Sequence, residues 1–168
     1  MKTLASIVVT LAMTLSLHAQ KFGYVNTAAL LEQMPEVQTA DKQLSAFREG
    51  LVKGGEAKVN SFKENYQKYL DDVNNGVLSQ IQQNERESSL AQEQQAINDY
   101  DQQVQQQVLD KRQELLKPIL QKIDDAVQAI GKEGGYTFIF DSSVSGALLY
   151  AVEGDDLMNQ VKAKLGIQ

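Results

Sequence analysis

The side chains that could carry out chemistry are few in this sequence. It contains no Cys and no Trp, and its single His is His18. His18 falls in a segment that we expect to be removed. Without His or Cys, the mature chain lacks the commonest general base, the commonest nucleophile–base pairings and the usual zinc ligands. We therefore expect no enzymatic activity and no cofactor.

One segment matches part of a calcium-loop pattern. Asp141, Ser143, Ser145 and Gly146 occupy its first, third, fifth and sixth positions. The twelfth position requires a bidentate Glu, but Val152 stands there. The flanking residues have strand character, whereas the motif needs helices. The match is a chance one, and we predict no metal site.

The first 19 residues have the pattern of a secretory signal peptide. Lys2 gives the positive start, residues 4–17 the apolar stretch and residues 17–19 the cleavage site. The rival interpretation is a transmembrane anchor, but a span needs about 20 apolar residues and this run is shorter and interrupted. Export without Cys fits a chain that folds without disulfides and excludes a lipid-anchored lipoprotein. We place the mature protein, cleaved near Ala19, in a periplasm-like compartment.

The mature chain is acidic. Without Lys2 it carries 15 basic and 22 acidic residues, a net charge near −7. This sign argues against nucleic acid and against an anionic membrane surface as primary partners. Membrane contact is therefore expected to be transient at most.

Residues 35–131 show long helical periodicity. Pro35 suits the first position of a helix, and apolar residues then recur at alternating spacings of three and four, as in a coiled coil. Gly54-Gly55 interrupts this stripe, and either a weak spot or a hinge explains it. The stripe comprises Val37, Ala40, Leu44, Phe47, Leu51, Phe62, Tyr66, Tyr69 and Val73.

A turn and a second long helix follow. Residues 71–76 (DDVNNG) are a helix stop, and Ser79 with Gln82 resembles a capping box. Pro118 should kink the second helix or mark where it leaves an arm. The two helices predict an antiparallel hairpin. The second stripe comprises Ile97, Tyr100, Val104, Val108, Leu115, Ile119, Ile123, Ala126 and Ile130.

The two ends of the mature chain have β character. We expect a short strand at 22–26, then a brief helix capped by Thr27 that ends before Pro35. After a Gly134-Gly135 stop we expect strands at 136–140 and 147–152. A last helix, capped by residues 155–156, should run from 157 to 165. The predicted fold class is α+β, with a helical-hairpin arm on a small β-rich body.

Neither part can cover its own apolar residues. A two-helix layer cannot surround its side chains, and three short strands with a helix make too small a sheet to stand alone. Both arguments predict oligomerisation through the body. Candidate contact residues on the inner face of the arm are Phe47, Leu51, Phe62, Tyr66, Tyr69, Ile97, Tyr100 and Val104. Candidate body residues are Tyr24, Val25, Tyr136, Phe138, Ile139, Phe140, Leu148, Leu149 and Tyr150.

Several of these segments, in this order, resemble the Skp (OmpH-like) family of periplasmic chaperones. The resemblance covers essentially the whole mature chain. The segments that carry it are 22–26 (FGYVN), 34–36 (MPE), 115–119 (LLKPI) with Ile123, 135–141 (GYTFIFD), 149–150 (LY) and 161–166 (VKAKLG).

The resemblance implies a homotrimer in which three helical arms surround a cavity. The shared β-barrel body would use residues 20–34 and 132–168, with strands at 24–26, 136–141 and 147–151, and residues 35–131 would form the arm. Such proteins hold unfolded outer-membrane β-barrel proteins soluble without ATP. Well-known members are basic, whereas this chain is acidic, so neither a lipopolysaccharide site nor strong electrostatic capture carries over. The alternative is an adaptor whose hairpin docks one specific folded envelope partner.

Overall fold

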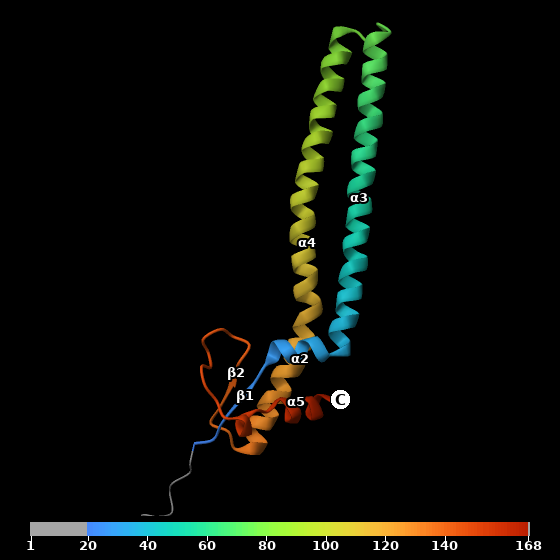
Figure 1. Cartoon of the computed structure of the whole chain (residues 1–168). Coiled ribbons are helices and arrows are strands. Elements are labelled where there is room, and N and C mark those ends of the chain that lie inside the picture. Colours follow the sequence, from blue (N-terminus) through green and yellow to red (C-terminus); the bar gives the residue numbers. More distant parts are fainter. Residues whose placement is uncertain (1–19, 168) are drawn as a thin grey trace, which may run out of the picture. The chain divides into compact units, whose positions relative to one another are not determined.

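Long helices make up most of the structure, as the sequence predicts. The computed structural model describes residues 20–167 (Figure 1), so the predicted signal peptide lies outside the described residues. Intrachain contacts divide the chain into an arm unit, Met34–Leu120, and a body unit made of the residues up to Gln33 and from Gln121. This division does not test the boundaries assigned from the sequence, which stay a prediction. The elements are β1 (Phe22–Val25), α2 (Thr27–Gln33), α3 (Pro35–Asn74), α4 (Gln80–Gly134), β2 (Phe138–Asp141), the 3-10 turn η1 (Glu153–Asp155) and α5 (Met158–Leu165).

In the arm unit, α3 and the first part of α4 lie side by side and antiparallel (Figure 1). Pro35 occupies the first turn of α3 with Glu36 beside it, as predicted. The proline has no N–H to leave unpaired there, and its fixed φ suits a helix start. α3 continues without a break through Gly54-Gly55 to Asn74.

The stop between the two helices is a Schellman motif. Gly76 has φ +66°, which a glycine adopts without steric cost. Its N–H donates to the Val73 carbonyl at 3.0 Å, and the Val77 N–H donates to the Asp72 carbonyl at 3.1 Å. The predicted helix stop is confirmed.

The predicted capping box at the start of α4 is also present. The Ser79 N–H donates to Gln82 Oε1 at 2.9 Å, and the Gln82 N–H donates to Ser79 Oγ at 3.4 Å. Each side chain satisfies a backbone donor that the helix itself leaves unpaired. α4 accordingly begins at Gln80.

Glutamines on the exposed surface of α4 pair with acidic residues one turn later. The Gln95 amide donates to Asp99 at 2.8 Å, and the Gln106 amide donates to Asp110 at 2.7 Å. Pairs of this spacing stabilise an isolated helix by roughly 0.2–0.5 kcal/mol each. The glutamine-rich segment is therefore a solvated helix face.

The body unit contains a two-stranded parallel sheet. β1 pairs with β2 in a register that sets Phe22 opposite Phe138 and Val25 opposite Asp141. The second edge of β1 is also occupied, because the Leu157 N–H donates to the Tyr24 carbonyl at 2.8 Å. β1 therefore lies between two neighbours.

The expected strand at 147–152 is wrong for this chain. The segment is irregular, and Leu149 and Tyr150 are 92% and 83% exposed. β1 offers this segment no partner, because its two edges are taken by β2 and by the bridge to Asp156. The outer edge of β2 stays unpaired in the single chain, so β-propensity alone does not bring the segment onto it.

Several element boundaries also differ from expectation. β1 ends at Val25 rather than at residue 26, and α5 begins at Met158, with Leu157 rather than residues 155–156 at its N-cap position. The cap of α2 is Asn26 rather than Thr27, since the Ala29 N–H donates to Asn26 Oδ1 at 2.9 Å. β2 begins at Phe138 rather than at Tyr136, because the Tyr136 N–H closes the end of α4 on the Gly131 carbonyl at 3.0 Å.

α5 ends as predicted, in a glycine stop, and packs into the body core. Asp156 Oδ1 accepts from the Met158 N–H at 2.8 Å, and Gly166 has φ +72°. The buried apolar side chains of the body unit come from both ends of the chain: Val25, Leu30, Ile123, Ala126, Ile130, Leu157 and Val161. Within residues 20–167, no helix combines the length and the apolar character that crossing a membrane requires.

Asp141 ties the end of β2 to the start of α2. Its Oδ1 accepts from the Thr27 N–H at 3.2 Å and the Ser143 N–H at 2.9 Å, and its Oδ2 accepts from the Thr27 hydroxyl. Partial burial pushes the pKa of this carboxyl up, but the hydrogen bonds from Thr27 and Ser143 outweigh it. The net result is a pKa below the ordinary value of 3.8.

We expect Asp141→Asn to be less stable than the wild type at neutral pH, and the difference to shrink in acid. A carboxyl whose pKa is depressed in the folded state contributes stability that is complete above 3.8 and is lost as the pH falls through the lower folded-state pKa. Urea unfolding of both proteins at neutral pH and well below 3.8 measures this. A difference that persists unchanged in acid would contradict the assignment.

Candidate functional site

The body unit presents an exposed aromatic face. The rings of Phe22, Phe138 and Phe140 pack together, with centroids 6.1 Å apart for the stacked pair Phe22–Phe138 and 6.2 Å apart for Phe138–Phe140. These three side chains remain 42%, 58% and 39% exposed. Aromatic rings clustered in this way bury large areas wherever a partner covers them. We call these three residues the aromatic face.

Strand alternation decides which body residues reach this face. Parallel pairing places Phe22 with Phe138 on one side of the sheet and Gly23 with Ile139 on the other. On that other side Val25 is buried, and the Ile139 Cδ1 lies 3.5 Å from the position of a Cβ on Gly131. The candidate body residues do not include Phe22. It lies two residues before Tyr24 in the predicted strand, so the two side chains share one side of the sheet.

The remaining candidate body residues differ in exposure. Tyr136 is half-buried and lies under Lys21, whose Nζ is 4.0 Å from the ring centroid. Tyr24 is half-buried, and burial followed by the charges of Asp156 and its acidic neighbours raises the pKa of its hydroxyl. Leu148 is half-buried, whereas Leu149 and Tyr150 extend into solvent.

The arm unit leaves most of its apolar stripe half-buried. In the arm unit the apolar residues buried to the level of a core are Met34, Ala40, Leu90 and Ile119. Tyr66 is the most exposed of the arm candidates, at 47%, and its ring stacks on Phe62 with centroids 6.1 Å apart. The other seven candidates are half-buried: Phe47, Leu51, Phe62, Tyr69, Ile97, Tyr100 and Val104.

Polar side chains fix the register of the two arm helices. The Asn65 amide donates to both oxygens of Glu93, at 3.1 and 3.0 Å. The Tyr69 hydroxyl donates to Glu87 Oε1 at 2.5 Å, and this hydrogen bond is the main cause of the raised pKa of Tyr69. A polar pair at a helix seam specifies one alignment over its neighbours. Apolar periodicity alone does not reveal such pairs, so they are not predicted from the sequence.

Residues 21–165 match the family model described as "Outer membrane protein (OmpH-like)". The chain belongs to the OmpH-like family. It is 24% identical over 159 residues to "Chaperone protein Skp" from Yersinia enterocolitica, across 94% of this chain and 93% of that protein. Its fold is similar to the crystal structure of a putative outer membrane chaperone (OmpH-like) from Caulobacter crescentus, with a TM-score of 0.70 and 14% identity. That similarity covers 87% of this chain and 83% of the solved one.

These findings confirm the family recognised from the sequence and the coarse fold class of long helices with a small two-stranded sheet. The OmpH-like family supports a chaperone role for the chain. Its chaperone relatives also fit the expectation of a protein without enzymatic chemistry. Among residues 20–167, no three His, Cys, Asp or Glu side chains come together as a metal site would require.

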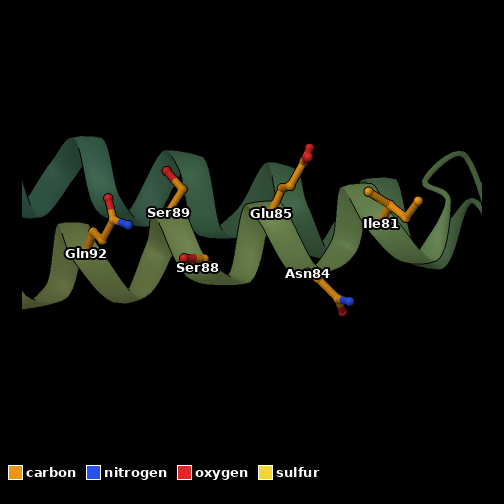
Figure 2. Close-up of a pocket in the computed structure, with 6 residues that line it drawn as sticks. All are labelled: Ile81, Asn84, Glu85, Ser88, Ser89 and Gln92. Carbon is orange, nitrogen blue, oxygen red and sulfur yellow. The ribbon is translucent and has the colours of Figure 1, made fainter.

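This OmpH-like arm also exposes apolar residues that the sequence analysis left out. Val77 and Ile81, next to the turn, are 63% and 71% exposed. Ile81 also borders a shallow, open hollow of about 530 Å³ on one side of α4 (Figure 2). The residues lining it are Ile81, Asn84, Glu85, Ser88, Ser89 and Gln92. Four of these six side chains are polar and uncharged.

Proposed function

We propose that the protein is an ATP-independent holdase of the periplasm that binds unfolded outer-membrane β-barrel proteins and prevents their aggregation. The observation that carries this proposal is the half-exposed apolar stripe on both arm helices. An unfolded β-barrel strand alternates apolar and polar residues, so it offers many separate apolar side chains and few large contiguous patches. A long stripe of partly exposed apolar residues suits such a chain through many weak contacts.

We propose further that the protein is a homotrimer assembled through its body. The aromatic face is exposed in a single chain, and a second and third copy would remove it from water. The outer edge of β2 is also unpaired in a single chain, and an exposed strand edge is covered when a neighbouring copy packs against it. The candidate body residues and domain boundaries given above belong to this proposal.

The acidic composition sets how such a holdase captures its clients. With 22 acidic and 16 basic residues in the full sequence, long-range attraction to acidic clients or anionic lipids is not available. Capture then depends on apolar contact, and we expect it to change little between low and high salt. Export by the predicted signal peptide, cleaved near Ala19, places the protein where such clients travel.

Turbidity of a urea-diluted β-barrel protein, with and without the mature chain, tests the holdase. We expect clear solutions for at least two unrelated barrels, and partial loss of protection when Phe62 and Tyr66 are both replaced by Ser. Gln95→Ser, on the solvated face, is the matched control and should protect as the wild type does. Protection of neither barrel, together with tight binding of one folded envelope protein, would favour the adaptor.

A further inference from the structure

Tyr100 of α4 lies directly against the glycine pair of α3. A Cβ built on Gly54 would stand 2.6 Å from the Tyr100 Oη, and one built on Gly55 would stand 3.3 Å from its Cε1. The first distance is shorter than Cβ atoms tolerate, so this position of the ring requires glycine at 54. Because the two glycines have no Cβ, they leave the space that an aromatic ring from the opposite helix fills.

The hydroxyl of the same ring is tied to α3. Tyr100 Oη donates to the Leu51 carbonyl at 2.8 Å, and the Lys58 Nζ lies 5.4 Å from the ring centroid. In a regular helix the carbonyl of residue 51 serves the N–H of residue 55. The hydroxyl thus joins α4 to the helical turn that contains both glycines.

That turn is the weakest point of α3. Glycine is the poorest helix former after proline, because it loses the most backbone freedom and leaves the backbone open to water. With Tyr100 seated, the ring covers the backbone there and α3 stays helical through both glycines. With the ring removed, the same two residues are where the helix opens most readily.

We propose that Tyr100 is a latch that holds α3 closed over Gly54 and Gly55, and that the arm bends at this point only when the ring leaves. Tyr100 is then a structural residue of the resting arm, although the sequence pattern predicts it as a contact residue. A bound chain that competes for the ring would open the latch. That last consequence rests on the proposed function, whereas the latch itself does not.

Hydrogen exchange of the mature protein alone, without any client, tests the latch. Tyr100→Phe keeps the ring and loses the hydrogen bond, and the amides of residues 54–58 should exchange about fivefold faster than in the wild type. Tyr100→Ala loses the ring as well, and the same amides should exchange about thirtyfold faster. Amides near the turn at residues 70–76 should keep their wild-type rates in both variants.

Gly50→Ala is the matched control, because a Cβ on Gly50 meets nothing within 4 Å. It should leave exchange at 54–58 unchanged or slower. Wild-type exchange at 54–58 in both Tyr100 variants, or equal acceleration along the whole of α3, would overturn the proposal. If Tyr100→Ala loses its helical circular dichroism, Tyr100→Phe decides alone. Since no client is present, failure of the holdase proposal would not affect this result.

Discussion

Phe138→Asp is expected to leave the mature protein as a folded monomer. In the proposed trimer the aromatic face is covered by the other copies, and a carboxylate there would be desolvated without a partner. Breaking a buried interaction to leave an unpaired charge costs roughly 3–5 kcal/mol per site. At about 1.4 kcal/mol per tenfold change, this weakens association by roughly two to four orders of magnitude for each copy. Light-scattering mass on a sizing column measures the result.

Ile139→Asp is the comparison that distinguishes loss of assembly from loss of folding. Ile139 points to the other side of the sheet, against α4 at Gly131, where it is half-buried, so a charge there is partly desolvated within the chain itself. We expect this variant to lose the cooperative unfolding of the body, whereas Phe138→Asp keeps it because its own chain leaves that side chain 58% exposed. A Phe138→Asp protein that still elutes at the mass of the wild-type oligomer would contradict the proposed interface.

Leu157→Ala is the second change with a large expected effect. Leu157 is 0% exposed, and its Cδ1 lies only 2.6 Å from where a Cβ on Gly23 would stand. Removing a fully buried leucine leaves a cavity and costs about 2–5 kcal/mol of unfolding free energy. Urea unfolding measures this loss. Leu109→Ala, at a helical position that is 53% exposed, is the control and should change the unfolding free energy by less than about 1 kcal/mol.

Several local signals of the sequence predict the structure correctly. The capping box at Ser79 and Gln82 and the glycine stops at Gly76 and Gly166 depend on residues within a single turn of the chain. Such signals act through backbone donors and acceptors only a few residues away. They can therefore be recognised from the sequence without a structure.

The errors concern residues whose environment is set by distant parts of the chain. The sequence predicts Thr27 as the cap of α2, but its hydroxyl donates to Asp141, 114 residues away, and Asn26 caps the helix instead. Segment 147–152 has strand composition, but it pairs with neither β1, whose two edges are taken, nor the outer edge of β2. β-propensity reflects a paired environment, so the sequence predicts the tendency and not the pairing.

The glycine pair of the arm shows the same limit at the candidate site. Gly54-Gly55 allowed two interpretations from the sequence, a weak spot or a hinge. The contact with Tyr100, whose hydroxyl bonds a residue 49 positions away, supplies the reason for glycine there. The apolar stripe itself is predictable from its spacing. The spacing does not show which residues of the stripe already make contacts within the arm and which remain available to a partner.

The measurement that tests the central claim most directly is light-scattering mass on a sizing column, for the mature protein mixed with a urea-diluted outer-membrane β-barrel protein. A holdase predicts one discrete soluble species whose mass equals three copies of this chain plus the client. An oligomer that elutes alone while the client aggregates would contradict the holdase, and a monomer would contradict the shared body.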